Sequence, residues 1–140
     1  EIGHVQAKHG AERVSLNMAS QTAQQVTAIA VNGTEYQGAA MAAIGLGAQY
    51  GLVLPYSRTH ESEADYIGLQ IMANAGFNPQ QAVELWRTMA KAGGAKSPEF
   101  MSTHPSNNTR IKKLSSQMVE ANGLYQQAKA KGLSPQCHKR

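Results

Sequence analysis

The sequence has 140 residues, of which 41% are hydrophobic, and this length supports one domain or part of one, with a modest core. Its formal net charge is +4, but the basic residues are scattered and no aromatic residues alternate with them. The charge therefore indicates a solvated face rather than a nucleic-acid site. Cys137 is the only cysteine, which excludes an internal disulfide.

Two helices are predicted at the start of the sequence. Apolar residues recur every three or four positions through residues 1–31, and the turn-forming pair Asn32-Gly33 ends this run. Residues 35–54 form the second helix, which is apolar and rich in small residues. Because this segment is short, contains several glycines and is closed by Pro55, we expect a buried helix rather than a membrane span.

Two more helices are expected in the middle of the sequence. Pro55 is expected to interrupt the chain, and the third helix then covers residues 58–75, up to Gly76. Asn78-Pro79 combines an N-cap residue with proline at the first helical position, which predicts a fourth helix over residues 79–92.

The remaining third of the sequence also predicts helices. Ser97-Pro98 indicates a short helical turn, His104-Pro105-Ser106 begins a helix that runs to about Ala121, and a weak helix covers residues 124–131. No segment alternates convincingly enough to be a strand. The sequence therefore predicts a mainly α fold, with one helical unit over residues 1–131 and a flexible tail over residues 132–140.

The first four residues carry the first chemical signal. Glu1-Ile2-Gly3-His4 matches the last four positions of H-E-x-x-H, in which two histidines on one helical face bind zinc. His4 would be the second of these histidines, and Glu1 the general base that takes a proton from the attacking water. The first histidine would precede Glu1, so we expect a truncated chain with weak zinc affinity and little activity. E-x-x-H alone is a weak signal, because it occurs by chance in many helices.

A second signal lies in the predicted third helix. Glu61 and Asp65 are four residues apart, so both side chains project from one face. One could bind the metal while the other orients a ligand histidine through its free ring nitrogen. The same acidic residues would also suit an ordinary solvated helix start, where they interact favourably with the helix dipole.

Three strings in order make a family resemblance specific. They are V-Q-A-K-H-G-A-E-R after His4 (Val5–Arg13), S-R-T-H-E-S-E-A-D-Y-I-G-L (Ser57–Leu69) and S-T-H-P-S-N-N-T-R-I (Ser102–Ile111). Together they resemble the HtpX/CAAX-prenyl-protease superfamily of zinc metallopeptidases, and within it the periplasmic LoiP/YcaL/BepA-like and mitochondrial Oma-like branch. The likeness covers roughly residues 1–115. It implies the helical part of a zincin-like (gluzincin) catalytic domain, without the strands that precede the active helix.

The resemblance also implies roles for individual residues. Glu1 matches the catalytic glutamate, His4 and Glu61 match zinc ligands, and Asp65 matches the aspartate that supports a ligand. His104 resembles a histidine near the active-site cleft, which would help to stabilise the oxyanion of the tetrahedral intermediate.

Neighbouring residues are expected to have other roles. Arg110 is expected to buttress its segment by a salt bridge. Glu63 is a rival zinc ligand, but it is disfavoured because Asp65 is then only two residues away and on another face. His9 lies about 500° of helical rotation after His4, off its face, and is expected to be structural or exposed. His60 is expected to point away from Glu61.

The function implied by the resemblance is zinc-dependent hydrolysis of unfolded or misassembled envelope proteins. The expected location is the periplasm, or the inner face of the outer membrane, of a Gram-negative bacterium. Membrane association and oligomerisation of the whole protein are left open. One alternative is a non-catalytic helical chaperone or assembly module that retains the peptidase skeleton. Another is a helical interaction domain with accidental motifs, which predicts that His4 and Glu61 lie far apart.

Overall fold

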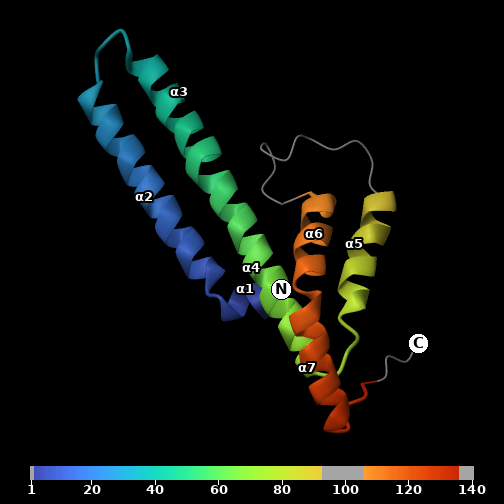
Figure 1. Ribbon diagram of the computed structural model, residues 1–140. Helices are drawn as coiled ribbons and strands as arrows, with labels where there is room; N and C mark the ends of the chain where they lie inside the picture. Colours follow the sequence, from blue (N-terminus) through green and yellow to red (C-terminus); the bar gives the residue numbers. More distant parts are fainter. Residues whose placement is uncertain (1, 93–105, 136–140) are drawn as a thin grey trace.

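The computed structural model describes residues 2–92 and 106–135. Over these residues the chain forms helices and turns and no strand, which confirms the predicted mainly α fold. The helices are α1 (Ile2–Gln6), α2 (His9–Ala30), α3 (Gln37–Ala48), a π-helical turn η1 (Gln49–Val53), α4 (Leu54–Asn74), α5 (Gln80–Ala92), α6 (Asn107–Ser116) and α7 (Met118–Ala130). Figure 1 shows α2 and α3 as a long hairpin that extends away from α5, α6 and α7, with α4 joining the two parts.

The helix predicted over residues 1–31 is in fact two helices. The chain breaks at Ala7 and Lys8, and Lys8 adopts the left-handed conformation with φ 59°. This conformation costs a non-glycine residue about 1–2 kcal/mol, so packing of the flanking helices must favour it. Because of this break, α1 and α2 do not share one helix axis. The angle between His4 and His9 can therefore not be counted as rotation along a single helix.

The expected interruption at Pro55 is also absent. Pro55 lies in the first turn of α4, and helical geometry continues from Gln37 through η1 to Asn74. Proline lacks an N–H group and crowds the preceding turn, and a π-helical turn relaxes that constraint by changing the hydrogen-bond register. The third predicted helix is therefore confirmed over most of its length, but it begins earlier than expected.

The later helices are close to the prediction. The helix α5 covers Gln80–Ala92, within the expected residues 79–92, and Ala92 is the last described residue of this part of the chain. The helix α6 begins at Asn107, where the Ser106 side chain caps the N–H group of Thr109 at 3.2 Å. A break at Gln117 then separates α6 from α7, so the helix expected to run to Ala121 is divided. The turn expected at Ser97-Pro98 lies outside the described residues.

The hydrophobic core lies among α4, α5, α6 and α7. Its buried members are Leu69, Ala73, Val83, Leu114, Met118 and Ala121, with Trp86 packed against them. The C-terminal half of α4 contributes Leu69 and Ala73 to this core. The N-terminal half of the same helix carries Glu61 and Ala64, so α4 connects the core to the candidate site.

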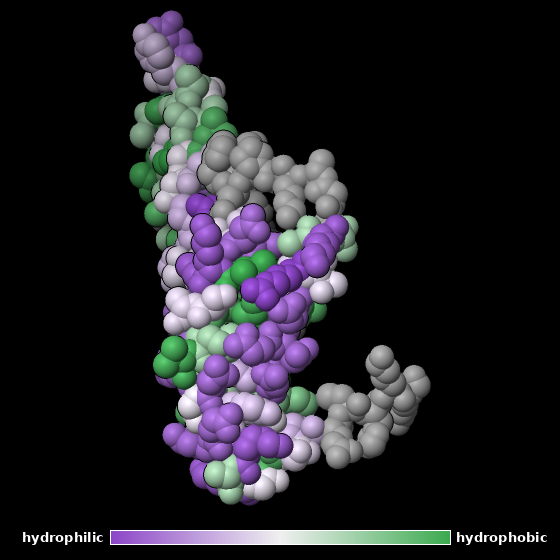
Figure 2. Space-filling model, turned by 45° about the vertical axis from the view of Figure 1, so that its right-hand side comes forward, coloured by the Kyte–Doolittle hydropathy of each residue, from purple (hydrophilic) through white to green (hydrophobic). Residues whose placement is uncertain are grey.

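The hairpin of α2 and α3 is exposed instead of buried. No residue of α3 is buried, so the expectation of a buried second helix is wrong for these residues. Between Val14 and Ser57 the only charged residue is Glu35, near the tip. Figure 2 shows hydrophobic side chains gathered along this part of the molecule. In the described part of the chain, Gln37–Asn74 is the one helix with the length and composition to cross a membrane.

A close backbone contact places α1 on α4. A Cβ atom built on Gly3 would lie 2.5 Å from the carbonyl oxygen of Ala64 and 2.9 Å from its Cα atom. Only glycine allows this approach, because the neighbouring atoms belong to backbone and cannot rotate away. His4 follows Gly3 directly, and Glu61 lies one helical turn before Ala64. The contact therefore brings the two predicted zinc ligands to the same point.

This contact predicts the effect of adding one methyl group. Gly3→Ala should force α1 away from α4 and lower the free energy of unfolding by about 1–3 kcal/mol, the usual cost of overpacking. Urea denaturation followed by circular dichroism measures this loss. Gly10→Ala is the matched control, because a Cβ atom there meets nothing within 4 Å and alanine favours the helix. Equal stability of the two variants would contradict the role given to Gly3.

Candidate metal centre

His4 and Glu61 face each other across α1 and α4. The Nε2 atom of His4 lies 3.4 Å from the Oε1 atom of Glu61. Glu61 is nearly buried, whereas the His4 side chain is 28% exposed, so the pair lies at the edge of the packed region. This proximity contradicts the accidental-motif alternative, which predicted that the two residues would be far apart.

The geometry of this pair fits a shared zinc ion. Zinc binds imidazole nitrogen and carboxylate oxygen at about 2.0–2.2 Å, and two ligands of a tetrahedral site are then about 3.4 Å apart. The observed separation of Nε2 and Oε1 is 3.4 Å. Residues 2–92 and 106–135 contain no group of three histidine, cysteine, aspartate or glutamate side chains that could hold a metal. His4 and Glu61 therefore account for two ligands.

Arg110 on α6 holds both acidic residues of the predicted pair. It binds Asp65 through two hydrogen bonds, Nε to Oδ2 at 2.7 Å and Nη2 to Oδ1 at 2.5 Å. Its third contact runs from Nη1 to Oε2 of Glu61 at 3.1 Å. The salt bridge predicted for Arg110 is thus confirmed. The carboxylate of Asp65 binds Arg110, which in turn holds Glu61, and the predicted orientation of a ligand histidine by Asp65 stays a prediction.

The same arginine connects the site to the hydrophobic core. The Cζ atom of Arg110 lies 3.7 Å from the centre of the Trp86 ring, a cation–π contact. Trp86 lies on α5 and packs against the core. The position of Glu61 is therefore fixed by helices other than its own.

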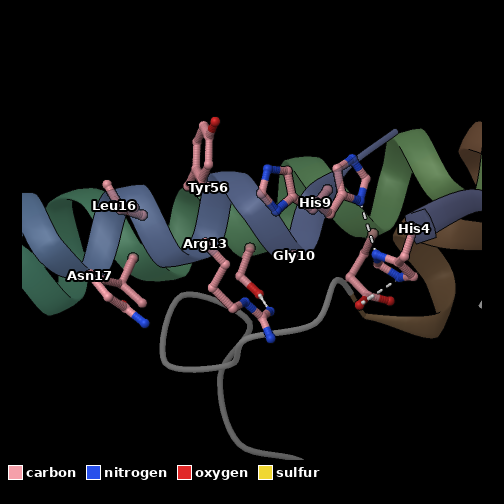
Figure 3. A pocket seen from close by; sticks show the side chains of 11 residues that line it. His4, His9, Gly10, Arg13, Leu16, Asn17 and Tyr56 are labelled. Atoms are coloured by element: carbon pink, nitrogen blue, oxygen red, sulfur yellow. Dashed lines mark hydrogen bonds and ion pairs between the residues drawn. The ribbon is translucent and has the colours of Figure 1, made fainter. Parts of the chain in front are cut away.

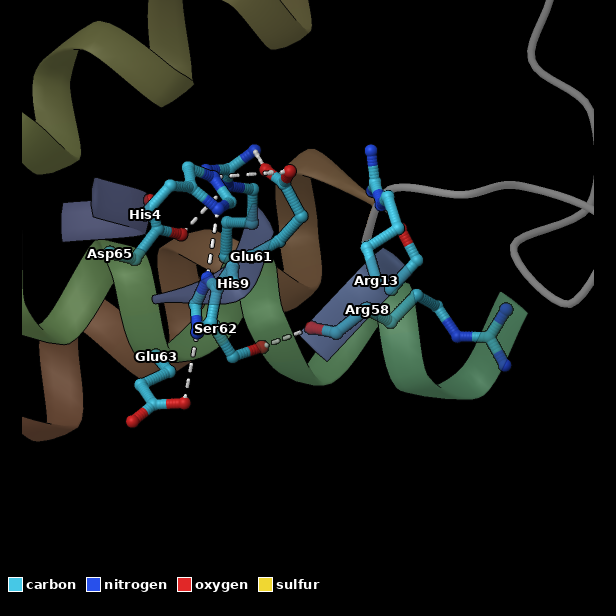
Figure 4. Close-up of polar contacts among 10 residues, drawn as sticks. His4, His9, Arg13, Arg58, Glu61, Ser62, Glu63 and Asp65 are labelled. Atoms are coloured by element: carbon cyan, nitrogen blue, oxygen red, sulfur yellow. Dashed lines mark hydrogen bonds and ion pairs between the residues drawn. The ribbon is translucent and has the colours of Figure 1, made fainter. Parts of the chain in front are cut away.

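His9 lies beside His4, which the sequence analysis did not anticipate. The Nδ1 atoms of the two rings are 2.9 Å apart, and Nε2 of His9 lies 3.1 Å from Oε2 of Glu63 (Figure 4). His9 is only 4% exposed. The prediction that His9 lies off the face of His4 is wrong, because it assumed one continuous helix, whereas the chain turns at Lys8. No glycine or proline marks that turn in the sequence. The burial of His9 fits the structural role that was one of its two expected roles.

A second histidine cluster joins α2 to α4. The His60 ring stacks on that of His9 with centres 4.0 Å apart, and its Nε2 atom lies 2.8 Å from Oε2 of Glu12. Tyr56 donates a hydrogen bond to the same carboxylate oxygen at 3.1 Å. The hydrogen bonds from Tyr56 and His60 lower the pKa of Glu12, and the same Tyr56–Glu12 bond raises the pKa of Tyr56.

A pocket opens along α2 and α4 beside His4 and Glu61, as Figure 3 shows. Arg13 spans part of it by donating a hydrogen bond to Ser57 at 3.2 Å. The lining is both polar and apolar, and besides these residues it includes His9, Gly10, Leu16, Asn17, Val53, Tyr56 and His60.

Glu1 and His104 lie outside the described residues. Their predicted roles as general base and oxyanion stabiliser therefore stay predictions.

Comparison with known proteins identifies relatives of this chain. Residues 1–118 match the model of peptidase family M48. The mitochondrial metalloendopeptidase OMA1 of Schizosaccharomyces pombe is 38% identical over 130 residues, covering 86% of this chain and 35% of that protein. The Arabidopsis thaliana protein of that name is 35% identical over 132 residues (93% and 26%). The Saccharomyces cerevisiae protein is 43% identical over 83 residues (55% and 24%). No solved structure matches the chain significantly.

Two facts follow from these relatives. The chain spans about a quarter to a third of the length of the relatives described above. The expected location in a Gram-negative periplasm is wrong, because these relatives are mitochondrial proteins of eukaryotes.

The Arg110 network predicts a large effect of one substitution. Arg110→Ala removes the guanidinium group that Glu61 and Asp65 share, and breaking such a nearly buried ion pair costs about 3 kcal/mol. Chemical denaturation measures the loss. The matched control is Arg87→Ala, whose ion pair with Glu84 is about half exposed and should contribute about 0.5 kcal/mol or less. A loss at Arg110 no larger than at Arg87 would show that the network does not hold the site.

Proposed function

The chain belongs to peptidase family M48, and we propose that it forms the metal-binding helical part of a zinc endopeptidase that cleaves unfolded or misassembled proteins. The observation that carries this proposal is the contact between His4 and Glu61, which are far apart in sequence and 3.4 Å apart in space. Relatives named as metalloendopeptidases support the reaction class.

His4 and Glu61 are the residues that would hold the zinc ion. Glu61 presents Oε1 towards His4, because Arg110 binds its other oxygen, Oε2. Arg110 is in turn fixed by Asp65. This arrangement keeps the negative charge of Glu61 directed at the ligand position, as effective metal sites require of the groups around a ligand.

The chemistry divides between the metal and the chain. When bound, zinc would polarise the carbonyl group of the substrate and acidify water. Glu1 would take the proton of the attacking water on its carboxylate and deliver it to the departing amine. His104 would donate a hydrogen bond to the oxyanion that forms at the carbonyl oxygen.

The pocket beside His4 suits an extended peptide segment. Arg13 and Asn17 offer hydrogen-bonding groups to a substrate backbone, whereas Leu16 and Val53 offer apolar surface to its side chains. Such a mixed lining can contact both the backbone and the side chains of a peptide. The pocket lies between α2 and α4, where an extended segment fits more readily than a folded domain. This supports unfolded or misassembled proteins as substrates.

The competing proposal is a helical chaperone that retains the peptidase skeleton without activity. The two proposals predict different results for a protein that contains this chain together with residues upstream of Glu1. There, Glu1→Gln should reduce hydrolysis of unfolded casein at least ~100-fold, because it removes the general base while keeping the size of the side chain. Peptide release measures this rate.

Glu35→Gln at the tip of the hairpin is the matched control and should leave the rate unchanged. Unaltered hydrolysis after Glu1→Gln would refute the role of Glu1. A wild-type protein that prevents aggregation of casein without cleaving it would favour the chaperone.

A further inference from the structure

Four side chains form a line that leads from the surface to the candidate metal position. Glu63 contacts Nε2 of His9 at 3.1 Å, and Nδ1 of His9 contacts Nδ1 of His4 at 2.9 Å. The remaining nitrogen of His4, Nε2, then faces Oε1 of Glu61 at 3.4 Å. Figure 4 shows the ring of His9 between that of His4 and the carboxylate of Glu63.

Two arrangements of protons on neutral rings each satisfy two of the three contacts along this line, and the shorter contacts, at 2.9 and 3.1 Å against 3.4 Å, favour one of them. A neutral imidazole carries one N–H group and one lone pair, and an ionised carboxylate only accepts. Since Glu63 accepts, Nε2 of His9 must donate, which leaves a lone pair on its Nδ1 atom. The Nδ1 atom of His4 must then donate to that lone pair. His4 is left with a lone pair on Nε2, directed towards Glu61.

The opposite arrangement is unfavourable. A proton on Nε2 of His4 would satisfy its 3.4 Å contact with Glu61, but it would place a lone pair of His9 against the carboxylate of Glu63 at the shorter distance of 3.1 Å. In the favourable arrangement, however, a lone pair of His4 faces a carboxylate oxygen of Glu61. Two acceptors in that relation attract a cation, which is the property that a metal site needs.

We infer that His9, fixed by Glu63, is the positioning residue that keeps the proton of His4 on Nδ1 and its Nε2 lone pair directed towards the metal position. The inference deepens the proposed function, because it rests on His4 being a metal ligand. Partners of this kind orient a ligand ring and increase its basicity, and their loss lowers metal affinity about 10–100-fold.

The surroundings of His9 support this role. Its ring is 4% exposed and lies parallel to the His60 ring, with an angle of 9° between their planes. His60 is itself held by Glu12. The stacking fixes the plane of the His9 ring, and the contact with Glu63 fixes which of its nitrogens faces His4.

The first test reads the proton positions directly. Long-range ¹H–¹⁵N NMR spectra of the metal-free chain distinguish the Nδ1–H form from the Nε2–H form of each histidine. We expect the Nδ1–H form for His4 and the Nε2–H form for His9. An Nε2–H form of wild-type His4 would overturn the inference, whatever the zinc affinity of the chain.

The second test uses substitution. His9→Phe keeps a flat ring for stacking but removes both nitrogens, so His4 should change to the Nε2–H form, and zinc affinity should fall about 10–100-fold. His9→Asn returns an acceptor near the position of Nδ1 and should restore part of both properties. His60→Phe is the matched control, because His60 contacts Glu12 and not His4.

The outcomes separate this inference from the proposed function. Unchanged zinc affinity and an unchanged His4 proton in a folded His9→Phe variant would overturn the inference alone. A chain in which His4→Ala leaves zinc binding unaffected would refute the proposed metal site, whereas the NMR result would still decide how His9 positions His4. Circular dichroism identifies any variant that fails to fold, and for such a variant the wild-type proton positions decide.

Discussion

The close approach of Gly3 to the backbone of Ala64 is the constraint on which the candidate site depends. Zinc ligands must come within about 2 Å of one point, and the α1 helix is short, so it cannot hold His4 there by its own stability. The close contact between the backbones of Gly3 and Ala64 holds α1 against α4 in place of a larger packed interface. The left-handed turn at Lys8 then directs α2 away and places His9 against His4.

The helix α4 connects the hydrophobic core to the candidate site. Near its C-terminus, Leu69 and Ala73 belong to the core that α5, α6 and α7 share, and Glu61 and Asp65 lie further towards its N-terminus. Arg110 adds a second connection, because it lies over Trp86 and binds both carboxylates. A small core can thus position a polar site at its edge. The N-terminal part of α2 contributes one wall of the pocket rather than part of the core.

The sequence predicted the parts of this arrangement that follow from helical spacing and motif chemistry. His4 and Glu61 lie close together, as the family resemblance implied, and Arg110 forms a salt bridge as expected, although its partners Glu61 and Asp65 were not predicted. His9 was misplaced, since a left-handed lysine leaves no signal in the sequence and only tertiary packing favours it. Asp65 lies on the same face of α4 as Glu61, as expected, and it binds Arg110. This partner was not predictable, because it depends on how α6, which carries Arg110, packs against α4. Pro55 and the apolar α3 helix were misjudged because local rules do not reveal a π-helical turn or an exposed surface.

The central claim is that one metal ion binds between His4 and Glu61. The most direct measurement is a zinc titration of the chain followed by NMR of the His4 ring nitrogens and the Glu61 side-chain carboxyl carbon. If one zinc ion binds both groups, Nε2 of His4 and the carboxyl carbon of Glu61 respond together with one weak dissociation constant, and Gly3→Ala abolishes the joint response. Separate responses of the two groups, or a joint response that persists in Gly3→Ala, would contradict the central claim.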